Sequence, residues 1–179
     1  MRKNLILSVL GACLLVAAAS GAAAAAGGSS STYYAGQNSQ GQKLFFTVDQ
    51  TKRGPEFDPY FINQIDFCPA TGNSITLDFS FSGFEIPIVH GKFDFNMNAP
   101  FQRFDWQGTL SSTGASGTEY IDLPLFDNEG GLQDCTAGVL NWTAKKLVSA
   151  STAPVAPRAS YTVKVSKGSD GSVQYSVSH

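Results

Sequence analysis

The segment Ile75–Ser82 alternates apolar and polar residues without a break, as Ile-Thr-Leu-Asp-Phe-Ser-Phe-Ser. Successive side chains of a β-strand point to opposite faces, so the four apolar residues share one face and the polar residues share the other. The pattern predicts a strand that buries one face and leaves the other in solvent. It constrains the fold of the chain more than any other feature of the sequence.

The same alternation recurs at roughly ten-residue spacing through the middle of the chain, and it favours an all-β fold. Further strands are predicted at 43–48, 60–67, 84–89, 92–97, 104–110, 119–125 and 139–144. Many short, evenly spaced strands are typical of an antiparallel β-sandwich or a small β-barrel. We favour a sandwich of about eight strands, because prolines such as Pro87 and Pro124 suit sheet edges, which a closed barrel lacks. The small barrel is the alternative.

Three polar segments that contain glycine are interpreted as connections between these strands. Residues 33–42 form a turn or bulge ahead of the first strand, residues 49–55 break the chain before the second, and residues 111–117 form a Ser/Thr/Gly turn. Glycine and proline are the strongest local breaks in regular structure, which is the basis of each assignment.

Residues 1–26 have the order of parts of a secretory signal peptide. A basic opening that contains Arg2 and Lys3 is followed by the apolar run Leu5–Ala19 and then by small residues, with cleavage expected near Ala24 to Ala26. We therefore predict a secreted, extracellular protein with no membrane segment after cleavage. The sequence Leu-Gly-Ala-Cys that ends at Cys13 is similar to a bacterial lipobox, so lipid anchoring through Cys13 is the alternative.

The remainder of the chain divides by composition. Residues 27–32 are a Gly/Ser spacer, residues 33–146 form the β-domain, and residues 147–158 are an Ala/Ser/Pro linker. Residues 159–179 contain two alternating segments joined through Asp170-Gly171, which predicts a C-terminal β-hairpin. Because an isolated hairpin is marginal in water, we expect it to dock on the main domain or on a neighbour.

Charge argues against two classes of partner. The chain has 12 Lys and Arg against 14 Asp and Glu, a net charge of −2, and removal of Arg2 and Lys3 with the signal peptide lowers it to −4. An acidic domain with no basic cluster beyond Lys145-Lys146 does not suit nucleic acid or an anionic membrane surface.

Two cysteines, Cys68 and Cys135, remain after residue 26. Export through an oxidising compartment favours a disulfide between them. Closing a loop of this length stabilises a fold by roughly 4 kcal/mol. The alternative is a pair of buried free thiols.

The opening Tyr-Ala-Gly-Gln-Asn-Ser-Gln-Gly of residues 34–41 is followed by Phe-Thr-Val at 46–48, and the β-domain closes with Cys-Thr-Ala-Gly at 135–138 and Trp-Thr-Ala at 142–144. These motifs resemble those of small secreted bacterial β-domain proteins of unknown function. The likeness covers residues 33–146. It implies a self-contained secreted domain and supports a Cys68–Cys135 bridge, and it brings no activity, ligand or catalytic residue.

Groups that could carry catalysis are sparse. The acids on or near predicted strands are Asp78, Asp94, Asp105, Glu119 and Asp122, which could supply the carboxylate pair of a glycoside hydrolase. They lack the spacing of a known motif and are interpreted as solvated acids. His90 is the only histidine besides His179 and is interpreted as a turn residue. A triad or a His-rich metal site is therefore not expected, and we predict no catalytic residue, metal or cofactor.

Four aromatic residues are candidates for ligand binding: Tyr33, Tyr34, Trp106 and Tyr120. Flat aromatic faces stack on sugar rings, whereas packing in the core is the usual role of such residues. The sequence thus favours a non-enzymatic secreted or cell-surface domain that binds an extracellular ligand, such as a carbohydrate or cell-wall component, or serves as a structural module. The alternative is a small secreted hydrolase that uses surface carboxylates.

Overall fold

The structure is a computed structural model that describes residues 30–99, 102–126, 132–149, 152, 159 and 161–178. The predicted signal peptide with Cys13, residues 27–29 of the spacer and most of the linker lie outside these residues, whereas residues 30–32 of the spacer belong to the first strand. Within the described residues the chain is all-β, as predicted, and contains no α-helix. Accordingly, no helix of the described part is long and apolar enough to cross a membrane.

Twelve strands are described, against about eight expected for the β-domain and two for the C-terminal hairpin. They are β1 (Ser30–Asn38), β2 (Lys43–Thr51), β3 (Gly54–Cys68), β4 (Asn73–Ser82), β5 (Ile86–Pro87), β6 (Lys92–Ala99), β7 (Gln102–Leu110), β8 (Gly114–Phe126), β9 (Leu132–Thr136), β10 (Leu140–Lys146), β11 (Tyr161–Lys167) and β12 (Val173–Ser178).

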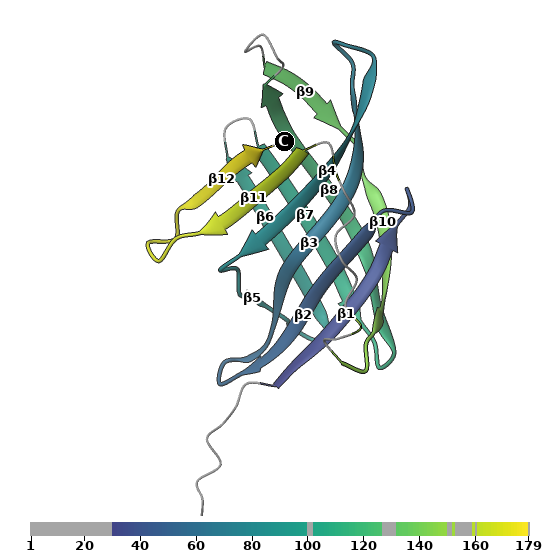
Figure 1. Cartoon of the computed structure of the whole chain (residues 1–179). Coiled ribbons are helices and arrows are strands. Elements are labelled where there is room, and N and C mark those ends of the chain that lie inside the picture. The colour runs from purple at the N-terminus through teal and green to yellow at the C-terminus, as the bar shows by residue number, and fades with distance from the viewer. Residues whose placement is uncertain are drawn as a thin grey trace, which may run out of the picture.

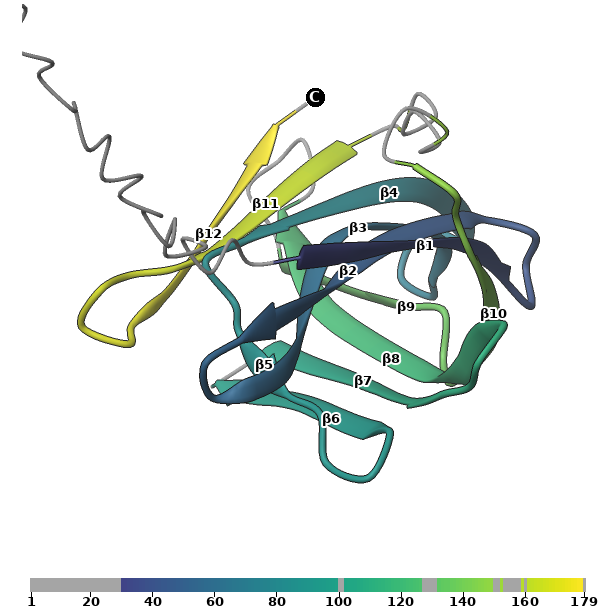
Figure 2. The same ribbon diagram turned by 90° about the horizontal axis from the view of Figure 1, so that it is seen from below.

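Six of the strands close into an antiparallel barrel, so the small-barrel alternative describes the fold better than the sandwich. The ring runs β3-β2-β1-β10-β8-β9 and returns to β3. Beyond the ring, β4, β11 and β12 extend the sheet from β3, while β7 and β6 extend it from β8. Figures 1 and 2 show these extensions as two layers that face each other, with β10 joining the layers on one side.

A proline fits inside this ring because of where β8 changes partners. Pro124 pairs with Asp134 of β9, and it lies beyond the last residue pair between β8 and β7, Arg103–Asp122. The missing N–H of a proline is tolerated where a strand has a free side. The sequence argument from prolines to sheet edges therefore holds locally, although the barrel as a whole is closed.

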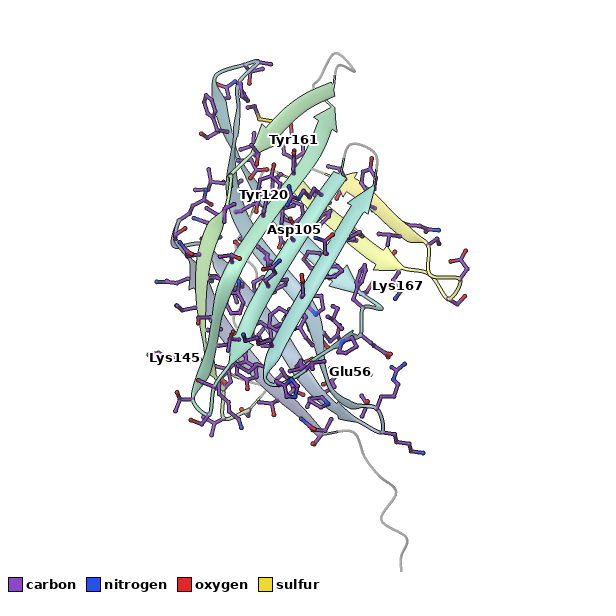
Figure 3. The ribbon with its side chains drawn as sticks, turned by 180° about the vertical axis from the view of Figure 1, so that it is seen from behind. Glu56, Asp105, Tyr120, Lys145, Tyr161 and Lys167 are labelled. Carbon is purple, nitrogen blue, oxygen red and sulfur yellow. A yellow bond between two sulfur atoms is a disulfide. The ribbon has the colours of Figure 1, made fainter. Side chains whose placement is uncertain are left out.

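The ring closes at its weakest point beside the disulfide. Strands β3 and β9 share a single residue pair, Phe67–Thr136. The adjacent residues Cys68 and Cys135 are bonded, with their sulfur atoms 2.08 Å apart, which confirms the predicted disulfide; the bond is drawn in yellow in Figure 3. A covalent link thus stands where the backbone ladder is shortest.

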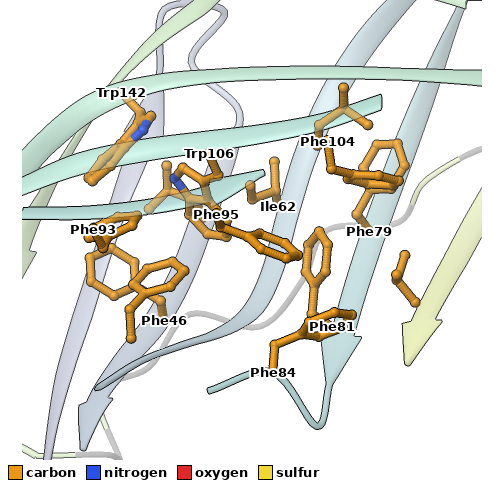
Figure 4. Packing of buried hydrophobic residues seen from close by; sticks show 14 of the residues in the cluster. Phe46, Ile62, Phe79, Phe81, Phe84, Phe93, Phe95, Phe104, Trp106 and Trp142 are labelled. Atoms are coloured by element: carbon orange, nitrogen blue, oxygen red, sulfur yellow. The ribbon is translucent and has the colours of Figure 1, made fainter. Parts of the chain in front are cut away.

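Aromatic side chains fill the interior. Phe46 contacts Trp106 and Trp142 edge-on, with ring centroids 5.9 and 5.8 Å away (Figure 4). Phe57 stacks on Phe93 with ring centroids 3.9 Å apart. Gly108 makes room for this cluster, because a Cβ there would lie 2.6 Å from atoms of Phe93 and 2.7 Å from Trp142. The alternating residues of several strands thus meet in one core, as their two-residue period predicts.

The three segments predicted to connect strands are largely part of strands themselves. Residues 33–38 belong to β1, β2 continues to Thr51 and β3 begins at Gly54, and β8 begins at Gly114. These polar stretches are held as strands by ladder partners on both sides, since tertiary pairing overrides weak local propensity. His90 lies in a turn between β5 and β6, as expected, and has a φ of 51°.

The C-terminal hairpin, β11 and β12, extends the main sheet at the edge of β4. Strand β11 pairs with β4 in parallel, with Val163 beside Phe79 and Val165 beside Phe81. Both valines are buried in the common core. The stretch Ile75–Ser82 therefore lies between β3 and β11 and is covered on both edges.

Candidate ligand-binding face

The four candidate aromatic residues lie in three different places. Tyr34 and Trp106 point into the barrel and are only 6% and 2% exposed, so neither can line a surface platform. Tyr33 is on the outer face of β1, while Tyr120 is on the outer face of β8 in the opposite layer (Figure 3). The structure does not bring the four together.

Tyr120 belongs to a polar network in which Arg103 lies over its ring. The guanidinium carbon of Arg103 lies over the ring, 4.9 Å from its centroid, and the Tyr120 hydroxyl donates to Asp122 at 3.1 Å. Arg103 also pairs with Asp105, with Nη2 of the guanidinium 2.5 Å from the carboxylate. A pocket of about 240 Å³ borders this network, but the aromatic face within it is already covered. We assign the network to stability.

Tyr33 belongs to a second group, which we call the tyrosine face. It consists of Tyr33, Phe45, Tyr60, Asp49 and Asp58, on the outer side of β1, β2 and β3. Tyr33 stacks on Phe45 with ring centroids 6.2 Å apart and an interplanar angle of 10°. Tyr60 meets the same phenylalanine edge-on at 5.4 Å. Phe45 is nearly covered, so the two tyrosines flank an apolar floor.

A β-bulge places Tyr60 in this position. Phe45 pairs with Phe61 and Phe46 pairs with Pro59, which leaves Tyr60 as an extra residue with no partner on β2. Bulges bend a strand and turn a side chain away from the regular alternation. Tyr60 is 49% exposed as a result, more than is usual for a tyrosine packed against neighbouring rings.

Two carboxylates lie beside the rings. Asp58 is in one row with Tyr33, because both pair with Thr47, and Asp49 is two residues further along β2 on the same side. Burial, followed by the neighbouring charges of Asp49 and Glu85, raises the pKa of Asp58 to about 6. Burial, followed by the charges of Asp58 and Asp49 and by Tyr33, raises the pKa of the Tyr60 hydroxyl.

The arginine in the turn between β2 and β3 is paired with other carboxylates. Arg53, in the β2–β3 turn, pairs with Glu56 at 2.9 Å and with Glu85. Among the described residues no ion pair involves Asp49 or Asp58, and one oxygen of Asp49 is buried without a hydrogen-bond partner. The tyrosine face is therefore aromatic and negatively charged.

The acids considered for catalysis are spread over the molecule. Asp78 accepts a hydrogen bond from Asn63 on β3, Asp94 is exposed on β6, and Asp105 and Asp122 belong to the Arg103 network. Glu119 points into the barrel and is 1% exposed. Asp105 and Glu119 both border the pocket of about 240 Å³ beside Arg103, but Asp78, Asp94 and Asp122 are not among its lining residues.

The barrel interior contains two carboxyl groups of its own. Glu119 accepts a hydrogen bond from Asn38 at 2.8 Å, and burial raises its pKa to about 8. Asp66 accepts one from Gln64, and burial raises its pKa to about 7. Both are sealed from solvent. In the part of the chain that the structure describes, no group of three or more His, Cys, Asp or Glu residues is placed to hold a metal ion.

Sequence reasoning identified Tyr33 but missed its partners. Residues 49–55 were expected to break the strand, whereas β2 and β3 form one long hairpin with its turn at Lys52-Arg53. The hairpin brings Asp49 and Asp58 together across the sheet. Acids at similar distances on either side of a Gly-containing turn are the signal that could have found them.

Comparison of the chain with protein-family models, with curated protein sequences and with solved structures finds no match. The assignment of a function therefore depends on the chemistry of the tyrosine face itself.

Proposed function

We propose that the protein is a secreted or cell-surface binding domain, without enzymatic activity, that takes a carbohydrate on the tyrosine face. The observation that carries the proposal is the exposed Tyr60 ring, which packs with Tyr33 on opposite sides of Phe45 and has the carboxylates of Asp58 and Asp49 as neighbouring charges. Aromatic faces pack on the C–H faces of sugars, and ionised carboxylates accept hydrogen bonds from sugar hydroxyls. The resemblance to small secreted bacterial β-domains stays a prediction that agrees with this proposal.

Charge narrows the class of carbohydrate. Two carboxylates without a paired cation repel sulfated or uronic-acid sugars and attract amino sugars. A neutral glycan, or a cell-wall glycan with free amino groups, thus fits the tyrosine face better than an anionic one. Secretion is supported by the disulfide, since such bonds persist in oxidising compartments.

The experiment is a glycan and peptidoglycan array probed with the purified protein, followed by titration of the strongest ligands. We expect neutral or amino-sugar ligands, and we expect Tyr60→Ala to weaken binding at least about tenfold because the most exposed ring of the site is lost. Tyr120→Ala is the matched control, since its ring is covered by Arg103, and it leaves binding unchanged. Equal binding by Tyr60→Ala, or a preference for anionic glycans, contradicts the proposal.

One observation favours the hydrolase as a second candidate. Asp58, whose pKa burial raises to about 6, lies near Asp49, and glycoside hydrolases use two carboxyl groups, one of which has a raised pKa and serves as the acid. The same array ligands, incubated with protein and examined for cleavage, separate the two functions. Turnover that Asp58→Asn abolishes establishes the enzyme, whereas intact ligands that remain bound support the binding domain.

A further inference from the structure

Strand β12 forms one margin of the twelve-stranded sheet. It pairs with β11 on one side, and the described strands supply no partner for the other (Figures 1 and 2). All six of its residues are exposed. An edge strand of this kind presents unpaired backbone N–H and C=O groups, which are a template for another strand.

Nothing in β12 protects this edge. Its sequence, Val-Gln-Tyr-Ser-Val-Ser, contains no charged residue and no proline, which are the usual means of preventing edge pairing. The opposite margin, β6, presents Lys92 and Asp94 instead. Charged residues thus protect the β6 edge of the sheet, whereas the β12 edge has none.

The apolar side chains of β12 continue the core of the molecule. Val173, Tyr175 and Val177 are between 38% and 40% exposed. Tyr175 and Val177 pair with Val165 and Val163 of β11, so these residues share one face of the hairpin, and the two β11 valines are buried. A strand added beyond β12 would therefore extend an existing apolar layer and bury the stripe Val173-Tyr175-Val177.

The stripe has the same residues when read from either end, as Val-x-Tyr-x-Val. In an antiparallel pair about a two-fold axis at Tyr175, this residue lies opposite Tyr175 of the partner subunit, and Val173 lies opposite Val177 of the partner subunit. A self-complementary patch is what a two-fold interface requires. The absence of charge removes any repulsion between identical strands.

We propose that β12 is a self-association edge, through which two copies of this chain pair antiparallel about Tyr175 and join their sheets. The pairing adds a ladder of backbone hydrogen bonds and a continuous apolar layer. Its area is small, so the dimer is weak and depends on protein concentration. The proposal is independent of the ligand taken by the tyrosine face, which lies on β1–β3.

The first test is sedimentation equilibrium of the purified protein from about 1 to about 500 µM, a range that covers weak interfaces. We expect reversible dimerisation. Tyr175→Lys places two like charges opposite each other and weakens the dimer at least about tenfold. Gln174→Lys is the matched control, because it adds the same charge to the other face of the same strand, and it leaves the dimer within about threefold of the unmodified protein.

The second test reads the register directly. In a Cys13→Ser background, Tyr175→Cys forms an intersubunit disulfide under mild oxidation, because directly opposite residues have the Cα separation that a disulfide needs. Val173→Cys is too far from its own symmetry mate to do so.

The proposal is overturned by a monomer at every concentration, by a dimer that Tyr175→Lys does not weaken, or by equal crosslinking of the two cysteine variants. A complex that forms only with an extended peptide from another protein also overturns it, because that result assigns β12 to a different strand. Because Tyr175 is exposed, the monomeric variants are expected to retain the melting temperature of the monomer, which is measured alongside.

Discussion

At the scale of single residues, the outward and inward positions of the strands differ in their exposure to solvent. Outward positions hold the tyrosine face and the Arg103 network, whereas inward ones hold the aromatic core and two buried carboxyls. The two-residue period predicted the inward position of Phe46. Trp106, which was a candidate for ligand binding, also lies inward and is 2% exposed. The period could not predict that Glu119 occupies an inward position, because a single acid in an apolar phase carries no signal of its hydrogen-bond partner Asn38.

Glu119 makes stability depend on pH. Burial raises its pKa in the folded state to about 8, above the value of 4.5 for an unperturbed glutamate, so the folded protein holds this proton more tightly than the unfolded chain does. The resulting stabilisation is fully present below pH 4.5 and is lost as the pH rises through about 8. Asp66 and Asp58, with pKa values raised to about 7 and about 6, act in the same direction.

The prediction is that the melting temperature falls between pH 5 and pH 9, and that Glu119→Gln makes this fall shallower. The glutamine keeps an oxygen that can accept from Asn38 but cannot ionise. Melting is followed by circular dichroism across the pH range. Asp94→Asn, which alters an exposed carboxylate on β6, is the control and retains the original slope. An unaltered slope in Glu119→Gln would assign the pH dependence to other groups.

At the scale of elements, strands with a strong apolar phase could be predicted and strands without one could not. β4, β6 and β7 each carry two or more large apolar residues at every second position. β1 was missed because Gly36 and Asn38 stand at alternate positions where large apolar residues would reveal a strand. The turn expected at 111–117 was partly wrong for a similar reason, since Gly114 and Gly117 are small residues inside β8.

The docked hairpin is an element whose contribution can be measured. Val163→Ala removes two methyl groups from a fully buried site beside Phe79, and we expect it to lower the free energy of unfolding by about 2 kcal/mol. Lys164→Ala, at the neighbouring exposed position, changes it by less than about 0.5 kcal/mol. Urea denaturation of both variants provides the comparison, and equal stabilities would contradict the docking of β11 on β4.

At the scale of the whole molecule, closure of the barrel depends on a short junction. The sequence predicted that Cys68 and Cys135 are bonded, but not that their bond stands at the single pair between β3 and β9. Closure is a property of the complete strand order, which local periodicity does not encode. The choice between sandwich and barrel was therefore beyond the reach of strand patterns: the prolines favoured the sandwich, whereas the ring of six strands fits the small-barrel alternative.

The position of the disulfide predicts what its removal does. Reduction, or the double variant Cys68→Ala/Cys135→Ala, is expected to lower stability by about 4 kcal/mol, because a long loop is released in the unfolded chain. Amide hydrogens of β9 are expected to exchange faster than those of β2, since β9 then keeps one residue pair with β3. Hydrogen exchange with mass spectrometry checks both strands. Unchanged exchange in β9 after reduction would show that the ring stays closed without the bond.

The parallel pairing of β4 with β11 has a consequence for how the chain is made. β4 is complete at Ser82, yet the strand that covers its free edge begins only at Tyr161. As the polypeptide emerges from the ribosome, Phe79 and Phe81 are made long before the two valines that pack beside them. Pairing between segments so far apart in the sequence forms slowly, so the nascent chain exposes the apolar edge of β4 until β11 has been made.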